Sequence, residues 1–146
     1  MNDVAVHNPA ALTARLHGGD PFLALLGIEL AGIVDGRLAL EMTVRADHLN
    51  FLGGAHGGVL FALADSAFGM AANAKGTVSV GIDTHMAYVQ GCREGDRLRA
   101  EAEEVSRSRR TAVYRVDVTR GGEPVATFTG TVYLTERALP DGLQAP

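Results

Sequence analysis

Asp65 is the residue of this 146-residue chain whose surroundings point most directly to chemistry. It is the only ionisable side chain in residues 57–74. At helical spacing its neighbours are apolar or small: Phe61, Ala62, Phe68 and Gly69. A carboxylate without a partner is costly to bury, and apolar surroundings tend to raise its pKa. The pattern predicts a general base or a nucleophile; an aspartate at a solvent-exposed break in a helix face is the structural alternative.

The second candidate is the triplet His56-Gly57-Gly58, at the predicted start of the same helix. Free N–H groups at a helix N-terminus carry partial positive charge, and glycine lets a ligand approach the backbone. Such a helix end can serve as an oxyanion hole or an anion site, although a plain loop-to-helix junction has the same residues.

The spacing of these two candidates predicts that two chains build the site. Gly57 and Asp65 are eight residues apart, which is about 12 Å along a helix axis. An oxyanion donor and a base must both lie within about 3 Å of the reacting group. One helix cannot meet that condition, but two antiparallel copies in a two-fold dimer can, and the two-fold axis then generates two identical sites.

The elements that must hold these residues are one apolar helix, predicted over 57–75, and a series of strand-like runs. The runs cover 28–34, 37–45, 77–89, 97–106, 111–120 and 124–135. Asp35-Gly36 between the first two runs predicts a type I′ hairpin. Strands before and after one buried helix predict an α+β fold in which an antiparallel sheet covers the helix. We expect a helical extension over 1–19, a single domain over 20–136 and a flexible tail over 137–146.

Composition excludes several classes of protein. The net charge of −4 argues against nucleic-acid binding. The single cysteine, Cys92, excludes an intramolecular disulfide and a multi-cysteine metal site, and no histidine pair has helical metal-ligand spacing. We therefore expect no metal. No targeting or membrane segment is evident, so we expect no membrane association and a cytoplasmic location.

Residues 48–76, HLNFLGGAHGGVLFALADSAFGMAANAKG, resemble the hotdog-fold acyl-CoA thioesterases, especially the phenylacetate-degradation type. The matching positions are Asn50, Gly53, His56-Gly57-Gly58 and Leu63-Ala64-Asp65. Weaker similarity extends over about 20–136. The resemblance implies a hotdog fold, in which a curved antiparallel sheet of five to six strands wraps a long central helix. It also implies a homodimer with composite sites, usually paired into a homotetramer.

The resemblance also implies roles for individual residues. Asp65 is the catalytic carboxylate, and the Gly57 N–H polarises the thioester carbonyl, with Gly58 beside it on the substrate side. Asn50 orients water or the carboxylate, and His56 supports the oxyanion hole. No cofactor is implied beyond the coenzyme A of the substrate itself.

Two features of the resemblance stay open. Arg109 and Arg110, beside Arg107, either contact the coenzyme A phosphates or form a solvated strand end. Related enzymes often place a Ser or Thr on the strand after the helix to position water. Here that position falls on Gly81 or a neighbour, with Thr84 the nearest later hydroxyl, so no residue is assigned to it.

The predicted reaction is hydrolysis of an acyl-CoA, with a preference for aryl-acyl or phenylacetyl groups that rests on the resemblance alone. Four side chains could line an aryl pocket: Phe51, Leu60, Phe61 and Phe68. A hotdog hydratase or dehydratase, and a non-catalytic acyl-CoA-binding module, are the alternatives.

Overall fold

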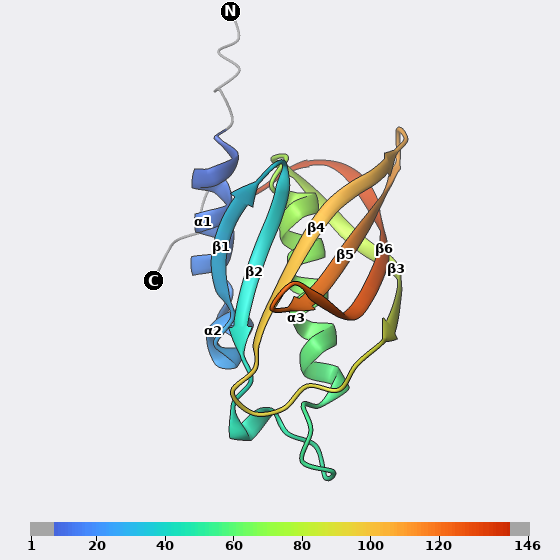
Figure 1. The fold of residues 1–146 in the computed structure, drawn as a ribbon. Helices are drawn as coiled ribbons and strands as arrows, with labels where there is room; N and C mark the ends of the chain where they lie inside the picture. Colours follow the sequence, from blue (N-terminus) through green and yellow to red (C-terminus); the bar gives the residue numbers. More distant parts are fainter. Residues whose placement is uncertain (1–7, 141–146) are drawn as a thin grey trace, which may run out of the picture.

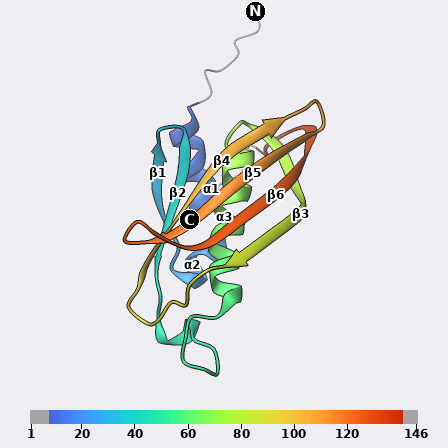
Figure 2. The ribbon, with the colours of Figure 1, turned by 45° about the vertical axis from the view of Figure 1, so that its right-hand side comes forward.

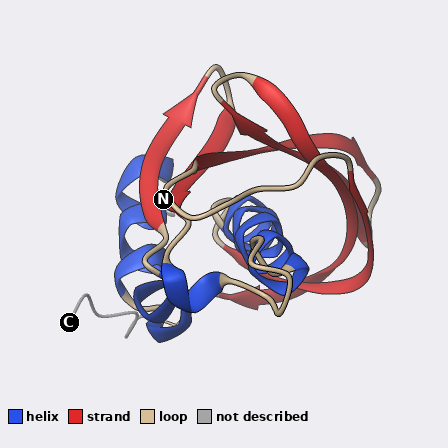
Figure 3. Cartoon of the chain, turned by 60° about the horizontal axis from the view of Figure 1, so that its bottom comes forward, coloured by secondary structure: helices blue, strands red, loops and turns tan. Residues whose placement is uncertain are grey.

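The computed structural model describes residues 8–140, in which an antiparallel sheet wraps around a central helix (Figure 1). The elements are α1 (Pro9–Gly18), α2 (Pro21–Leu26), β1 (Glu29–Val34), β2 (Arg37–Thr43), a short 3-10 helix (Ala46–His48), α3 (Gly57–Asn73), β3 (Thr77–Tyr88), β4 (Arg97–Arg107), β5 (Thr111–Arg120) and β6 (Glu123–Ala138). The strand order is β1-β2-β4-β5-β6-β3. Figure 3 shows the sheet curving around α3. The predicted α+β fold is confirmed.

Local sequence signals explain where the elements begin and turn. Asn8 caps α1, because its side-chain oxygen accepts hydrogen bonds from the N–H groups of Ala10 and Ala11. Asp20 caps α2 in the same way. At the β1–β2 hairpin, Asp35 has φ 51° and Gly36 has φ 75°, as the predicted type I′ turn requires.

The core lies between α3 and the concave face of the sheet. The Phe68 ring, on α3, lies 5.9 Å from that of Tyr114 and 5.4 Å from that of Phe128. Two strand glycines, Gly81 and Gly130, leave room for it: a Cβ atom on Gly130 would stand 2.7 Å from the Phe68 ring. Part of the high glycine content, 18 of 146 residues, therefore serves close packing of the sheet on the helix.

The two edges of the sheet differ. α1 packs against β1 (Figure 1), whereas β3 lies on the opposite side of the molecule (Figure 2) and is exposed over much of its length. Exposed apolar side chains on and just after β3 are Val80, Ile82, Tyr88 and Val89. An exposed apolar edge strand is a surface for pairing with another strand.

The division into a helical extension, a single domain and a tail stays a prediction, and the helices and strands fall within it as follows. α1 occupies most of the predicted extension, and β6 continues to Ala138, past the expected boundary at 136. Residues 1–7 and 141–146, which include most of the predicted tail, lie outside the described residues. Within residues 8–140, no helix is long and apolar enough to cross a membrane.

Candidate active site

The N-terminus of α3 is capped by His56. Its Nδ1 accepts a hydrogen bond from the Gly58 N–H at 2.8 Å, so the proton of the neutral imidazole lies on Nε2. A Cβ atom on Gly58 would lie 3.0 Å from this Nδ1. The N–H of Gly58 is thus taken by the cap, and its lack of a side chain admits the imidazole; the predicted contact of Gly58 with substrate stays a prediction.

Capping leaves the Gly57 N–H as the open donor. The Val59 N–H bonds to the His56 carbonyl at 2.9 Å. Among the hydrogen bonds of the described residues, none uses the Gly57 N–H. A donor at a helix N-terminus is where an oxyanion is best stabilised, so the predicted donor is present and unoccupied by protein groups.

Tyr88, at the end of β3, holds the backbone of Gly57 from the other side. Its hydroxyl donates to the Gly57 carbonyl at 3.0 Å. A Cβ atom on Gly57 would lie 3.3 Å from the Tyr88 ring, so the ring is in close contact with this peptide. The sequence carries no signal for Tyr88, because only strand register brings a residue 31 positions away to the helix start.

Asp65 lies on α3 with its side chain exposed in the single chain. None of the hydrogen bonds or ion pairs among residues 8–140 involves it; the neighbouring protein supplies only desolvation, which raises the pKa of its carboxyl group. The neighbours expected from the sequence are confirmed as apolar: Ala62 and Phe68 are buried. A partnerless carboxylate with a raised pKa can accept a proton or attack a carbonyl.

In one chain Gly57 and Asp65 face different cavities. Asp65 lines a cavity of about 540 Å³ between α3 and the α1–α2 junction, whose wall includes Phe22 and Gly69. Gly57 lines one of about 290 Å³ with Tyr88 and Cys92. The two cavities share no lining residue. α3 is a regular helix over both positions, so the axial separation of about 12 Å stands.

Asn50 shapes the loop before α3. Its side-chain oxygen accepts from the N–H groups of Leu52 at 2.9 Å and Gly54 at 3.3 Å. Its backbone N–H donates to the Gly54 carbonyl at 2.7 Å. Gly53 permits the turn with φ 82°. The structure therefore uses the oxygen of Asn50 to fix the loop that carries His56, which leaves only its amide nitrogen for the predicted contact with water or a carboxylate.

With this geometry in place, comparisons with known proteins identify the family. The Thioesterase superfamily model matches residues 52–127. The chain belongs to the thioesterase superfamily. It is 33% identical over 116 residues to the acyl-coenzyme A thioesterase PaaI of Escherichia coli K12, covering 79% of this chain and 83% of PaaI. The predicted family and hotdog fold are confirmed.

Two solved structures are close to this thioesterase chain. A mutant of the phenylacetic acid degradation protein PaaI from Thermus thermophilus is 47% identical, with a TM-score of 0.75, covering 78% of this chain and 98% of that one. A hypothetical thioesterase from Streptococcus pneumoniae TIGR4, solved with coenzyme A, is 30% identical, with a TM-score of 0.71, covering 77% and 91%.

Arg109 and Arg110 lie far from Gly57 of the same thioesterase chain. They are exposed in the turn between β4 and β5. The Arg110 carbonyl accepts from the Leu134 N–H at 2.8 Å, and Leu134 pairs with Ser79, whose N–H donates to Asn73 at the C-terminal end of α3. The 17-residue helix is about 25 Å long, so these arginines can approach a Gly57 site only from another chain.

The strand after the helix has a bulge near the position that the sequence analysis leaves unassigned. Gly81 faces α3, since a Cβ atom there would lie 3.1 Å from the Phe68 ring. The register shifts between Gly81 and Asp83, and Thr84 then pairs with Gly130, which also faces Phe68. Because paired residues share a face, the bulge turns Thr84 toward the helix side of β3.

The aromatic residues divide differently from the expectation of an aryl pocket. Phe68 belongs to the core, Phe61 packs edge-on against Phe128 at 5.7 Å, and Phe51 is 96% exposed. Leu60 lines the Gly57 cavity. Phe22 lines the Asp65 cavity and is 51% exposed. Phe22 could not be selected for the site from the sequence, because it lies outside the segment that carries the recognisable motif.

Within the described part of the chain, no three His, Cys, Asp or Glu residues are grouped so as to hold a metal ion.

Proposed function

We propose that this chain hydrolyses acyl-CoA thioesters to a free acid and coenzyme A, and that aryl-acetyl groups are its preferred acyl class. The family and the relative named as an acyl-coenzyme A thioesterase support the reaction. The Thermus relative named for phenylacetic acid degradation supports the acyl class. The observation that carries the proposal is the pair formed by a free helix N-terminal N–H at Gly57 and a partnerless carboxylate at Asp65.

In the proposed reaction, the thioester carbonyl oxygen accepts a hydrogen bond from the Gly57 N–H of one chain. Asp65 of a second chain acts at the carbonyl carbon. As a general base, it takes a proton from the water that attacks; the tetrahedral oxyanion is held by Gly57, and the coenzyme A thiolate leaves and is protonated. As a nucleophile, its carboxylate displaces the coenzyme A thiolate to form a mixed anhydride, and water then hydrolyses this anhydride to the free acid and the regenerated Asp65 carboxylate. Incorporation of oxygen-18 from water into Asp65 in a single turnover excludes the pure general-base route.

The dimer that this chemistry needs has a candidate interface in β3. The edge of the sheet at β3 is open and carries exposed apolar side chains such as Ile82 and Val89. Pairing of two β3 strands would join the sheets and bring the cavities of two chains together. Arg109 and Arg110 of one chain are then candidates for the coenzyme A phosphates at the Gly57 site of the other, and Thr84 for positioning water. A further pairing into a tetramer stays a prediction.

The test is activity in mixtures of two inactive variants. Gly57→Pro removes the N–H itself; proline is favoured at the first position of a helix, and His56 already has the extended backbone (ψ 135°) that a residue before proline adopts. Gly57→Ala is the matched control, because it adds a Cβ atom and keeps the N–H. We expect Gly57→Pro and Asp65→Asn each to be inactive. Gly57→Ala, whose Cβ atom requires the Tyr88 ring to move by a few tenths of an ångström, should be clearly more active than Gly57→Pro.

Mixing decides whether the site is shared. A heterodimer of Gly57→Pro and Asp65→Asn chains has one site in which both residues are intact. After unfolding and refolding together in equal amounts, we expect about one quarter of the wild-type rate of thiol release per chain. Recovery of no activity from a mixture that forms heterodimers would place both residues of a site in one chain and contradict the proposal.

A further inference from the structure

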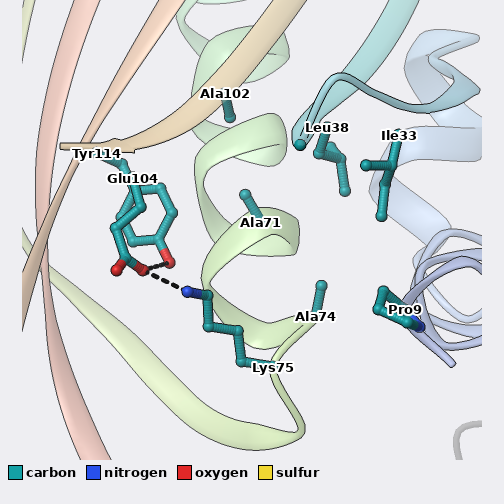
Figure 4. A pocket seen from close by; sticks show the side chains of 10 residues that line it. Pro9, Ile33, Leu38, Ala71, Ala74, Lys75, Ala102, Glu104 and Tyr114 are labelled. Atoms are coloured by element: carbon teal, nitrogen blue, oxygen red, sulfur yellow. Dashed lines mark hydrogen bonds and ion pairs between the residues drawn. The ribbon is translucent and has the colours of Figure 1, made fainter. Parts of the chain in front are cut away.

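A third cavity, of about 270 Å³, lies at the C-terminal end of α3 (Figure 4). Apolar side chains from α1, β1, β2, α3 and β4 form most of its wall, among them Ile33, Leu38 and Ala71. It shares no lining residue with the cavities of Gly57 or Asp65. Lys75, on its rim, is ten positions after Asp65, about 15 Å along the helix direction. The cavity is therefore separate from the catalytic groups of its own chain.

One side of this cavity is charged. The Glu104 carboxylate accepts from the Lys75 ammonium at 2.8 Å, the Tyr114 hydroxyl at 2.8 Å and the Arg107 guanidinium at 2.9 Å. Figure 4 shows Lys75, Glu104 and Tyr114 converging at this wall. These donors lower the pKa of Glu104 to about 2, while burial, followed by the bond to Glu104, raises that of Tyr114. Near neutral pH the cluster therefore has two positive charges and one negative.

The remaining hydrogen-bonding capacity of the cluster is that of a donor. Both oxygens of Glu104 already accept hydrogen bonds, so the negative charge of this carboxylate is balanced without a bound cation. The Lys75 ammonium has three N–H groups; the structure gives it an ion pair with Glu104, and its side chain is 49% exposed. Lys75 is also the only lysine of the chain, the other twelve basic residues among the 13 Lys and Arg being arginines. A net positive charge beside apolar walls matches an anion with an apolar body.

We infer that this cavity is a binding site for a small apolar monocarboxylate, with its carboxylate on Lys75 and its hydrocarbon part against Ile33, Leu38 and Ala71. The cavity has room for about nine water molecules at 30 Å³ each and lies just below the usual range of ligand pockets. That size suits one aromatic ring, or a short branched chain, with a carboxylate. The choice of ligand rests on the proposed function, because aryl-acetyl-CoA hydrolysis releases such acids. The existence of the cavity and its positive charge do not depend on the proposed function.

The test uses the single lysine as a reporter. Protein labelled with ¹³C,¹⁵N-lysine gives one lysine side-chain signal, that of Lys75. We expect phenylacetate to shift this signal in a saturable way, in both the wild-type protein and Asp65→Asn. Phenylacetamide, which has the same ring without the charge, and acetate, which has the charge without the ring, should leave it unmoved. Because no turnover is read, failure here and failure of the proposed reaction are distinguished.

Two variants complete the test. Lys75→Gln should weaken phenylacetate binding, measured by calorimetry, about tenfold or more, since a charge-assisted bond is lost. Ala71→Leu, which narrows the cavity but keeps the charge, should abolish binding and leave the Lys75–Glu104 ion pair intact in the spectrum. No saturable shift with phenylacetate, an equal shift with phenylacetamide or acetate, or displacement of phenylacetate by coenzyme A would each overturn the inference.

Discussion

The first half of α3 and the structure around its C-terminal end treat their polar groups in opposite ways. At the first residue and at the midpoint of α3, the Gly57 N–H and the Asp65 carboxylate have no partner among the described residues. Toward the C-terminus, Asn73 makes three hydrogen bonds, to Gly69 and to both backbone groups of Ser79, and Glu104 is held by three side chains. Because neither group is engaged within the chain, both are available to a ligand, and the exposed Asp65 carboxylate is solvated in the single chain.

Asp65 and Glu104 express this difference as pKa shifts of opposite sign. Desolvation without compensation raises the pKa of Asp65, whereas hydrogen bonds to Arg107, Lys75 and Tyr114 outweigh desolvation at Glu104 and lower its pKa. A raised pKa means that the ionised carboxylate disfavours the folded state; a lowered one means that it favours it. The same functional group thus lacks a compensating partner on α3 at Asp65, whereas at Glu104 on β4 it is paired and stabilises the fold.

Asp65→Asn should have the largest effect. Since the proposed base or nucleophile is removed, kcat should fall at least about 100-fold. Stability should be unchanged or slightly raised, because a desolvated charge is lost. Thiol release and thermal denaturation measure the two quantities. Asp117→Asn, an aspartate paired with Arg115 on β5, is the matched control and should leave both near wild type. A normal kcat in Asp65→Asn would contradict the proposed role of Asp65 and the difference drawn between Asp65 and Glu104.

Glu104→Gln should lower the free energy of unfolding, whereas Asp65→Asn should lower activity. The three donors would lose their negative partner, and allowing for partial solvent screening we expect about 2 kcal/mol less unfolding free energy. For a domain of this size that is a fall in Tm of about 4–8 °C. Glu103→Gln, next along β4 and paired with the exposed Arg37, should cost under about 1 kcal/mol. Equal losses at the two positions would show that the cluster is no stronger than a surface ion pair.

Lowering the pH should affect activity through Asp65 before it affects stability through Glu104. Asp65 must be ionised to act, so kcat/KM should fall about tenfold per pH unit below its pKa, at a pH above the ordinary value of 3.8. The stabilisation by Glu104 is fully present above its unfolded pKa near 4.5 and is lost as pH falls toward about 2. Activity should therefore decline while the protein is still folded, as circular dichroism at each pH can verify. Activity that persists down to the unfolding transition would contradict the raised pKa.

The proposed catalytic groups on α3 are easier to predict from the sequence than the other contacts of the candidate site. A lone aspartate in an apolar helix and a glycine pair after a potential cap are local signals, so the sequence alone suggests Asp65 and the His56-Gly57-Gly58 triplet as candidates, while their roles stay predictions. The hairpin at Asp35-Gly36 could be predicted for the same reason, because two adjacent residues determine its positive φ values.

Features that depend on strand register could not be predicted from the sequence. Thr84 turns toward α3 only because a bulge shifts β3 against β6, and Glu104 finds Lys75 and Tyr114 only through the pairing of distant strands. That the Gly58 N–H caps the helix through the His56 imidazole could not be predicted from the local pattern either, because the same N–H could serve a cap or a ligand.

Tyr88 offers the smallest and most specific change, because it touches the N-terminal end of α3 without belonging to the helix. Tyr88→Phe removes the hydroxyl that donates to the Gly57 carbonyl at 3.0 Å and keeps the ring against the Gly57 backbone. A neutral hydrogen bond contributes about 1 kcal/mol, so a peptide held less firmly should lower kcat about fivefold. KM and Tm should stay near wild type if the bond orients the oxyanion donor; a change confined to Tm would make Tyr88 a structural support only.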